Sequence, residues 1–455
     1  MDINEKQVVR LWQDVIRRQG VVSEEGELVT VVYPGRVNDS RGADFRDAVI
    51  LRGGVRIRGD IEVHVRSSHW WEHKHHLDQA YNRVILHVVL WRDEKITQSH
   101  LPSGEYVPLV VLEKYLNGGS GAVQSLSFRI GTYLPCREAV RRLSPEVVAG
   151  VLDDAGERRF RGKAGVLTAE IATAGVGQCL YQNIMVALGY ARNKEPFLEL
   201  ARRLPLRSLE SAGRAADNEE DYLVRQQALL VGTAGLLPSQ RPGYSDCGSG
   251  DEWVRRLEAV SASLSLKSVM SCRDWCLFKV RPHNHPVRRL VAMSYILLRF
   301  RQEGVLSGVV NLVRKSVFDG DAGELERSLS VICDGYWASH CDFGLRLGRE
   351  YPALLGGERA AEMAVNVLLP FILVWSRASS QPELGERALE VFRCYHGLPL
   401  NAVTRHMIVQ LGVNGKLVNS AHRQQGLIHL YQNYCIQGKC ETCLLRQALL
   451  PGRGL

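Results

Sequence analysis

The sequence of 455 residues predicts an α+β fold, with a mixed α/β domain at the N terminus and a mostly helical region after it. Short β-branched runs separated by Gly and Pro dominate the first 117 residues, whereas apolar residues recur at helical spacing beyond residue 143. A Gly- and Ser-rich stretch at 117–122 separates the two patterns and indicates a linker. We therefore expect an α/β domain at 1–117, a linker at 118–143, and helical regions at 144–240 and 251–455.

The N-terminal domain is expected to begin with an amphipathic helix and to continue as a meander of antiparallel strands. Residues 1–18 place apolar side chains at helical spacing, and residues 28–33 form a strand-like run that ends at Pro34-Gly35. Residues 48–52 and 55–58 flank Gly53-Gly54, which predicts a two-residue hairpin whose second strand continues to Arg66. A connection rich in His and Trp follows at 67–82, and further strands are expected at 84–90 and 106–112.

Beyond the linker, the sequence is typical of helices, with little strand signal. Ser144-Pro145 is a favourable helix start because Ser caps the first turn and Pro is tolerated in it. Residues 238–250 are expected to form a surface loop or a boundary inside the helical half. The helical runs are expected at 180–188, 197–203, 223–237, 253–264, 289–300, 360–375, 388–395 and 403–411.

Composition limits the class of protein. An apolar fraction of 45% is that of a soluble globular chain, and the first helix is too polar for a signal peptide. The longest apolar run, 363–375, is shorter than a membrane span. Eleven cysteines without a disulfide framework indicate a reducing compartment, so we expect a cytoplasmic protein with no membrane partner. The net charge of +8 permits an anionic partner but does not require one.

The most informative stretch of the chain is 58–66. Side chains alternate between the two faces of a strand, so Asp60, Glu62 and His64 share one face, between Arg58 and Arg66. The opposite face is apolar and is typical of a core. Carboxylates beside an imidazole suit metal binding and general-base chemistry. The alternative is a solvated strand face whose ion pairs satisfy one another.

Several phrases of the sequence resemble a family of bacterial proteins known only as a domain of unknown function. The resemblance extends over nearly the whole chain, but the family implies no activity. Its phrases are PGRVN (34–38), ADF (43–45), GDIEVHVRSS (59–68), HKHHLD (73–78), VILHV (84–88), RPHN (281–284), QQGLI (424–428) and the terminal cysteines.

The expected order of elements is also similar to the core of PD-(D/E)xK nucleases. In that group an acid begins the second strand, and an acid-x-Lys motif lies on the third. Asp44 stands at the first position and Glu62-Val63-His64 at the second, with His64 in place of the lysine. The resemblance implies that Asp44 and Glu62 bind Mg²⁺ or Mn²⁺ and that His64 orients or deprotonates water. Asp60 would be a third ligand or a neighbour of the ligands.

The register of the hairpin decides which acid faces Glu62. A regular register from the Gly53-Gly54 turn places Asp44 opposite Val63, on the core face, and makes Asp47 the better candidate. A one-residue bulge, plausible at Gly59, would move Asp44 to the side of Glu62. Both arrangements are open from the sequence.

The histidines of the connection allow a different kind of site. A transition metal could be held as in small β-barrel metalloenzymes of the cupin type. His75 and His76 are adjacent and point apart, so at most one of them is expected to bind with the others. The side chains available to such a site are His64, His73, His75, His76, Asp78 and His87.

Three cysteines near the C terminus predict a second metal site. Cys435-x4-Cys440-x2-Cys443 has a spacing that suits Zn²⁺ and also occurs in iron–sulfur sites. Either metal needs a fourth ligand from upstream. The nearest candidates are Cys394, His396, His422 and His429.

A basic segment, 275–302, contains no acidic residue. Arg281, Arg288 and Arg289 lie where two prolines predict a loop that leads into a helix. Such arginines can bind the phosphates of a nucleic acid, or they can act as a latch between domains by bonding the carbonyl groups at helix ends.

Taken together, these features favour a metal-dependent nuclease whose site includes Asp44, Asp60, Glu62 and His64. One alternative is a non-catalytic module that binds nucleic acid or protein and contains a structural metal. Another is a His-rich metal-dependent enzyme that acts on a small molecule.

Overall fold

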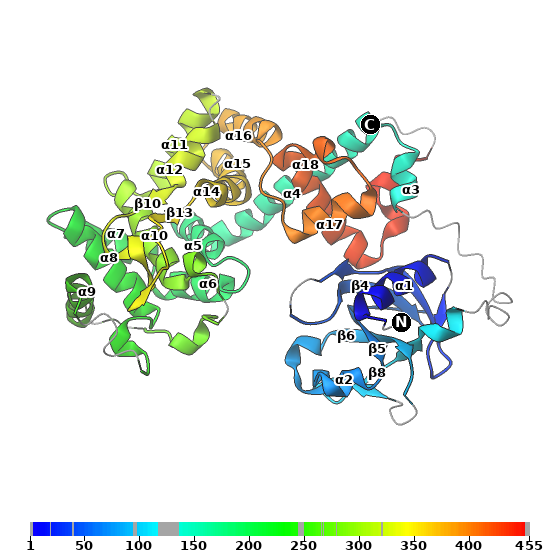
Figure 1. Ribbon diagram of the computed structural model, residues 1–455. Coiled ribbons are helices and arrows are strands. Elements are labelled where there is room, and N and C mark those ends of the chain that lie inside the picture. The colour runs from blue at the N-terminus through cyan, green and yellow to red at the C-terminus, as the bar shows by residue number, and fades with distance from the viewer. Residues whose placement is uncertain are drawn as a thin grey trace. The chain divides into compact units, whose positions relative to one another are not determined.

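The computed structural model describes residues 3–18, 20–38, 41–93, 98–116, 136–243, 250–264, 266, 268–278, 280–319 and 322–450. The chain divides into two compact units. We call Met1–Gly156, Leu400–Asn419 and Arg423–Leu455 the sheet unit, and Glu157–Pro399 with Ser420–His422 the helical unit. Strands of the main sheet lie in the first unit and helices dominate the second, which confirms the α+β class (Figure 1).

A mixed sheet forms the centre of the sheet unit. β5 pairs antiparallel with β4 and parallel with β6, and β9 adds a further parallel strand. Arg52 pairs with Val55 across Gly53-Gly54, so the expected hairpin is confirmed. Both glycines have positive φ angles, 56° and 79°, as a two-residue turn of this kind requires. The strands, in pairing order, are β1 (Val21–Val22), β2 (Leu28–Tyr33), β4 (Phe45–Arg52), β5 (Val55–Arg66), β6 (Val84–Trp91) and β9 (Leu109–Val111), with β3 (Arg36–Val37) beside β4.

Helix α1 (Glu5–Arg18) covers one face of this sheet. Its Val8 and Trp12 are fully buried and share a core with Ile61 and Val63 of β5. Because side chains alternate along β5, Glu62 and His64 point to the other face. The face pattern expected for this strand is therefore confirmed; Asp60, Glu62 and His64 are buried as well, whereas Arg58 and Arg66 at the two ends are exposed.

The connection from β5 to β6 contains short helical turns. Helix α2 (His69–Glu72) is followed by 3₁₀ turns at His75–Leu77 and Gln79–Tyr81. Trp70 and Tyr81 anchor the connection in a small core with Val84, which agrees with a packing role for Trp70. The strand expected at 106–112 is interrupted at Pro108, so that β8 (Tyr106–Val107) pairs with β7 (Ser99–His100) and β9 joins the main sheet.

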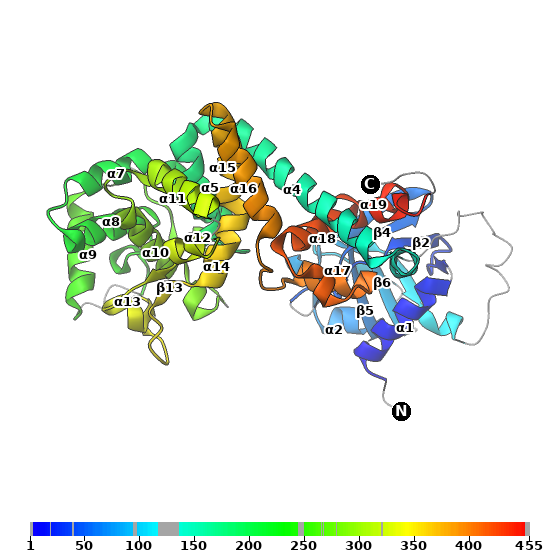
Figure 2. The ribbon, with the colours of Figure 1, turned by 90° about the horizontal axis from the view of Figure 1, so that it is seen from above.

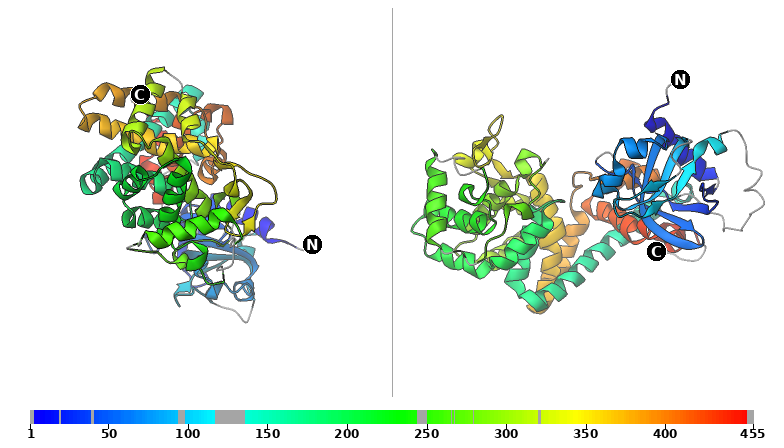
Figure 3. Two further views of the ribbon diagram at one scale, coloured as in Figure 1. Left: turned by 90° about the vertical axis from the view of Figure 1, so that its left-hand side faces the viewer. Right: turned by 90° about the horizontal axis from the view of Figure 1, so that it is seen from below.

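The C-terminal helices also belong to the sheet unit. Tyr33 and Val49 of the sheet share a core with Leu427 and Leu430, and the views of Figure 3 show these helices beside the strands. The units therefore do not follow the boundary expected at 251–455, because residues 400–419 and 423–455 group with the N-terminal strands. The helices concerned are α3 (Cys136–Arg141), the start of α4 (Pro145–Ala174), α17 (Ala402–Leu411), α18 (Ala421–Asn433) and α19 (Leu444–Gln447).

Of the expected linker at 118–143, residues 118–135 lie outside the described part, and Cys136–Arg141 forms helix α3 rather than linker. Helix α4 begins at Pro145, as the Ser144-Pro145 pair predicted.

The helical unit is built around one large apolar core. Figure 2 shows the helices of this unit grouped together. Four short strands pair in two small sheets, β10 (Val331–Ile332) with β13 (Ala353–Leu355) and β11 (His340–Asp342) with β12 (Leu345–Arg346). Its helices after α4 are α5 (Val176–Leu188), α6 (Lys194–Arg203), α7 (Leu206–Arg214), α8 (Glu219–Thr233), α9 (Glu252–Ser263), α10 (Pro286–Arg299), α11 (Val305–Asp319), α12 (Ala322–Leu329), α13 (Tyr336–Ser339), α14 (Gly357–Met363), α15 (Leu369–Ala378) and α16 (Pro382–Cys394).

Helices α14 and α15 are joined by a π-helical turn, Ala364–Leu368, into one apolar helix. Among the described residues this helix, Gly357–Ala378, is long and apolar enough to cross a membrane. However, 78% of its most apolar window is buried inside the protein, as in the core helix of a soluble protein.

Candidate functional site

A bulge in β4 decides which acid meets Glu62. Phe45 pairs with Ile61 and Ala48 with Gly59, so β4 contains one residue more than β5 between these pairs. Asp47 takes up the extra length with a positive φ of 59°, which Asp tolerates better than most residues. The bulge expected near Gly59 therefore exists, with its extra residue on β4.

As a result, Asp44 lies beside Glu62. The Asp44 N–H donates to Glu62 Oε2 at 3.1 Å, and Asp44 Oδ2 accepts from the Val63 N–H at 2.9 Å. The two acids chosen from the sequence are thus brought together, and Asp47 takes a different place.

Asp60 belongs to a cluster of arginines. Its Oδ2 accepts from Arg46 Nη1 at 2.6 Å, its Oδ1 accepts from the Asp47 N–H at 3.0 Å, and Arg83 lies 3.8 Å away. Asp47 in turn accepts from Arg58, Arg83 and Tyr431, each at 3.0 Å. Asp60 is fully buried, and both oxygens are already occupied by donors. Of the two roles expected for Asp60, this arrangement favours that of a neighbour of the ligands over that of a third ligand, and the role of Asp60 stays a prediction.

Glu62 meets two imidazoles instead. Its Oε1 lies 3.3 Å from His64 Nε2 and 3.2 Å from His75 Nε2. The two Nε2 atoms are themselves 3.3 Å apart, and the rings are stacked with centroids 5.2 Å apart. One carboxylate oxygen and two ring nitrogens therefore converge on one point, as the ligands of a single metal ion do.

A chain of hydrogen-bonding groups holds His64 through Nδ1, the ring nitrogen that does not face Glu62. His64 Nδ1 lies 2.9 Å from His87 Nε2, and His87 Nδ1 lies 2.8 Å from Ser99 Oγ. If His64 Nδ1 and His87 Nδ1 both donate along this chain, His64 Nε2 keeps its lone pair toward Glu62 and His75. This is how a neighbouring acceptor commonly selects the tautomer of a metal-binding histidine.

Two groups of metal-binding side chains lie next to each other. The ligand atoms of His64, His73 and His75 all lie within 4.8 Å of one another, and so do those of Glu5, His69 and His73. His73 belongs to both groups and is exposed, so the pair of groups opens to solvent. His69 Nδ1 is buried without a hydrogen-bond partner among the described residues and lies 3.7 Å from Glu5 Oε1. The residues present fit a transition metal, for which imidazole and carboxylate are suitable ligands.

Two residues of the expected histidine-rich set point elsewhere. His76 packs against Trp71, with ring centroids 4.4 Å apart and an angle of 43° between the ring planes. Asp78 is bonded to Arg41 at 2.9 and 3.0 Å and caps the Gln79–Tyr81 turn. Of the adjacent pair His75 and His76, only His75 thus faces the others, as expected. Glu5 was missed because its nearness to His69 arises from the packing of α1 on the sheet, which no local pattern encodes.

Burial perturbs the titration of the whole group. It raises the pKa of Glu62 to about 8, and burial with repulsion from Glu62 raises the pKa of Asp44 to about 7. Burial also lowers the pKa of His75, lowers that of His87 to about 3, and with the neighbouring imidazoles holds that of His64 far below its usual range. A bound divalent cation would lower the pKa of Glu62 and Asp44, because it stabilises their carboxylate forms.

The arginines chosen as nucleic-acid contacts lie at the start of α10. Arg281 is exposed, but Arg288 is fully buried and Arg289 is 5% exposed. Arg288 donates to backbone carbonyls, among them that of His340 at 2.7 Å and that of Tyr351 at 2.6 Å. Arg289 bonds the Tyr190 hydroxyl and Asn284. Phosphate binding by Arg288 and Arg289 is therefore corrected, since both act as internal latches of the helical unit.

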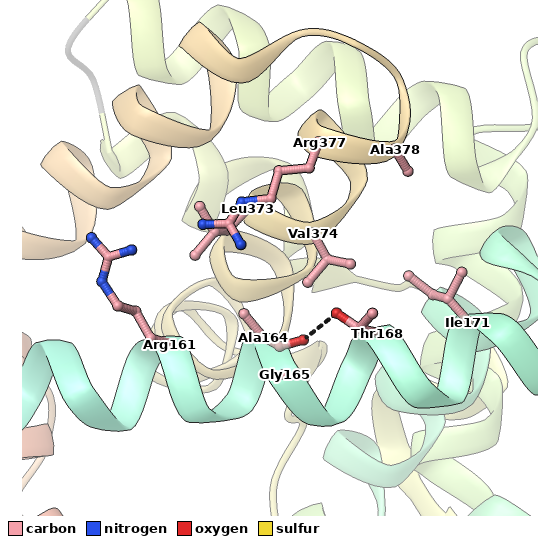
Figure 4. A pocket seen from close by; sticks show the side chains of 9 residues that line it. All are labelled: Arg161, Ala164, Gly165, Thr168, Ile171, Leu373, Val374, Arg377 and Ala378. Atoms are coloured by element: carbon pink, nitrogen blue, oxygen red, sulfur yellow. Dashed lines mark hydrogen bonds between the residues drawn. The ribbon is translucent and has the colours of Figure 1, made fainter.

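A pocket of about 510 Å³ lies in the helical unit, between α4 and α15 (Figure 4). Its wall is mostly apolar, with Arg161, Thr168 and Arg377 as its polar members. The Thr168 hydroxyl donates to the Ala164 carbonyl at 3.1 Å. Because no acid, histidine or cysteine lines this pocket, it provides no catalytic set comparable to that of the sheet unit.

The three C-terminal cysteines lie in the sheet unit. Cys435 is buried in the core that the sheet shares with the C-terminal helices, and Cys443 packs against that core. Cys440 begins a 3₁₀ turn, Cys440–Thr442, directly before Cys443. The cysteines are therefore separate from the histidine groups.

Comparison with known proteins identifies the family of this chain. Neither a search of curated proteins nor a search of solved structures returned a match, so the likeness to PD-(D/E)xK nucleases stays a prediction. One family model, described as "Protein of unknown function (DUF2851)", matches residues 5–396. This range includes every residue of the histidine groups, and it confirms the resemblance to an uncharacterised family. The chain belongs to the family of proteins of unknown function DUF2851.

Proposed function

We propose that the sheet unit is a metal-dependent phosphodiesterase that cleaves nucleic acid. The observation that carries the proposal is the convergence of Glu62 Oε1 on His64 Nε2 and His75 Nε2, at 3.3 and 3.2 Å. His73 and Asp44 adjoin this point. Few buried clusters in soluble proteins combine neutral imidazoles and uncompensated carboxylates unless they serve metal binding or catalysis.

The ligand set favours Mn²⁺, Zn²⁺ or Fe²⁺ over Mg²⁺. Three imidazoles are poor partners for Mg²⁺, which prefers oxygen ligands, but they suit the transition metals. Of the two ions expected from the sequence, the proposal keeps Mn²⁺ and sets Mg²⁺ aside, and it adds Zn²⁺ and Fe²⁺ as candidates. Glu62, His64 and His75 would bind the ion, and the exposed His73 would complete the set.

The chain's own residues can supply the remaining steps of hydrolysis. A bound divalent ion lowers the pKa of water and polarises a phosphoryl oxygen. Asp44 is held by the Val63 N–H through Oδ2, which leaves its other oxygen to accept a proton from the attacking water. His87 and Ser99 keep His64 in one orientation.

Cations next to the site support a phosphodiester substrate. Arg46 bonds Asp60, Arg58 and Arg83 bond Asp47, and Arg41 bonds Asp78 of the adjoining connection. The exposures of these four arginine side chains are 22, 41, 55 and 71% in that order. Their exposed N–H groups can contact the phosphates of a bound strand, which positions a backbone without reading its sequence.

The adjacent histidines His75 and His76 provide a matched test. The full chain is stripped with EDTA, reloaded with Mn²⁺, Zn²⁺, Fe²⁺ or Mg²⁺, and incubated with labelled single- and double-stranded DNA and RNA. We expect metal-dependent products from wild type and His76→Gln, and a loss of at least about 100-fold in His75→Gln.

Equal cleavage by His75→Gln and His76→Gln would place the activity outside this site. If folded, metal-loaded wild type cleaves none of the nucleic acids, the nuclease proposal fails. Retained metal without cleavage would then favour an enzyme acting on a small molecule, and salt-sensitive binding without turnover would favour a binding module.

A further inference from the structure

A fourth cysteine lies beside the C-terminal three. Gln410 Nε2 is 3.7 Å from Cys435 Sγ and also 3.7 Å from Cys136 Sγ. Cys136 begins α3, and α3 contacts both α17, which carries Gln410, and α19, which directly follows Cys443. The fold therefore brings Cys136 to the cluster from a distant part of the sequence.

The expected fourth ligands are placed elsewhere. Cys394, His396 and His422 belong to the helical unit, and His396 bonds Glu326 at 2.6 Å. His429 lies on α18 and bonds Asn433. Cys136 was not considered as a ligand from the sequence because it lies about 300 residues before the other three.

The backbone around the C-terminal cysteines is shaped for thiolate ligands. The turn Cys435–Gln437 ends at Gly438, whose φ of 61° is readily adopted by glycine, and the Gly438 N–H bonds the Cys435 carbonyl at 3.0 Å. Cys443 then takes the N-cap position of α19, and its backbone carbonyl accepts from the Arg446 N–H at 2.9 Å.

Three of the four cysteines share one core. Cys435 is buried in it, and Cys136 and Cys443 pack against it. Cys440 begins the turn Cys440–Thr442 directly before Cys443, so it lies within the same short stretch of chain.

We propose that Cys136, Cys435, Cys440 and Cys443 bind one thiophilic metal centre, either a zinc ion or an iron–sulfur cluster. Both centres use four cysteine thiolates. Binding would draw the sulfurs closer, because among the described residues only the two histidine-containing groups already have all ligand atoms within 4.8 Å. The centre would tie α3 and the C-terminal turns to the core that contains Tyr33 and Val49 of the sheet.

The full chain provides a direct test with a matched control. The parent protein carries His75→Gln, so that metal at the histidine groups does not enter the count. Metal and acid-labile sulfide are measured in this parent and in its Cys136→Ser, Cys440→Ser and Cys394→Ser variants, where Cys394 is exposed. We expect about one zinc ion, or iron with equivalent sulfide and visible absorption, in the parent and in the Cys394→Ser variant. Cys136→Ser should lose the metal as completely as Cys440→Ser.

A second measurement covers the case in which Cys136→Ser fails to fold. X-ray absorption at the metal edge of the protein with native cysteines should show four sulfur ligands, at about 2.3 Å for zinc. Three sulfurs and a nitrogen, or metal retained in full by Cys136→Ser, would overturn the assignment of Cys136. Absence of sulfur-bound metal from freshly purified protein would overturn the site itself, and neither result bears on cleavage by the histidine groups.

Discussion

Asp60 and Glu62 are two residues apart on β5 and both are buried, yet their surroundings differ completely. Asp60 is enclosed by donors, with Arg46 at 2.6 Å and the Asp47 N–H at 3.0 Å. Glu62 faces two imidazoles and a second carboxyl group, and it accepts a hydrogen bond from the Asp44 N–H at 3.1 Å. The difference arises because the bulge at Asp47 directs arginines to one acid and Asp44 to the other.

Asp60 and Glu62 differ in how their buried charge is compensated. A buried charge is tolerated when a cation and hydrogen bonds compensate it, and Asp60 has both within the protein. Glu62 has a bond from the Asp44 N–H and the attraction of Arg46, but burial outweighs both and raises its pKa to about 8. A metal ion would supply the missing positive charge, so the two acids should respond in opposite ways to the same kind of substitution.

The largest effect is expected from Glu62→Gln. Loss of the carboxylate should weaken Mn²⁺ or Zn²⁺ binding at the histidine groups by more than about 100-fold. Removal of a direct ligand lowers the metal affinity more than removal of a residue that only bonds a ligand, which costs about 10- to 100-fold. Without metal, the variant should be at least as stable as wild type, since a poorly compensated buried acid is removed. Isothermal titration of metal and thermal unfolding in EDTA check both parts. Unchanged metal affinity would remove Glu62 from the site.

Asp60→Asn should show the reverse pattern. The substitution leaves Arg46 without its buried partner, so we expect a loss of about 3 kcal/mol in the free energy of unfolding. Metal affinity should stay at the wild-type value, provided that the variant is folded at the assay temperature. Urea unfolding in EDTA, followed by metal titration, measures the two quantities. A stable variant that no longer binds metal would contradict the structural role of Asp60.

His87→Phe tests the support behind His64. The substitution removes the group that bonds His64 Nδ1, so His64 can turn or change tautomer. Outer partners of metal-binding histidines typically contribute 10- to 100-fold in affinity, and we expect a loss of about that size. His100→Phe is the control, because His100 contacts Trp71 and Tyr106 instead. Equal effects of both variants would indicate a general packing defect.

The smallest effect is expected in the pH dependence of the stability that Asp47, the neighbour of Asp60, contributes. Burial raises the pKa of Asp47, but bonds from Arg83, Arg58 and Tyr431 outweigh it and leave this pKa below its usual value. A lowered folded-state pKa contributes stability above the unfolded value, about 3.9, and this contribution is lost as pH falls through the folded one.

The free energy of unfolding of wild type should therefore exceed that of Asp47→Asn by about 1 kcal/mol at neutral pH, and this difference should vanish in acid. Asn retains the positive φ and most hydrogen bonds, so the comparison isolates the charge. Unfolding curves of both proteins between neutral pH and about pH 3 provide the measurement. A difference that does not change with pH would show that Asp47 acts through shape alone.

Local patterns in the sequence were sufficient for much of the fold. The periodicities predicted α1, the meander of β2, β4 and β5, and the α+β class, because strand and helix repeats are local properties. The Gly53-Gly54 turn predicted its hairpin since few other residues adopt two successive positive φ angles. Alternation along β5 likewise placed Glu62 and His64 on one face.

Contacts between distant segments decided the rest. The strand pattern by itself determined that Asp60, Glu62 and His64 are close neighbours, but it could not locate the bulge that separates their roles, because the choice between Gly59 and Asp47 depends on the partner strands. It also could not bring Glu5 to His69 or Cys136 to Cys435, since such meetings follow from how helices pack on the sheet. Only the tertiary structure decided which buried acid is paired with arginine and which lies against imidazoles, because compensation of a buried charge depends on every group that surrounds it.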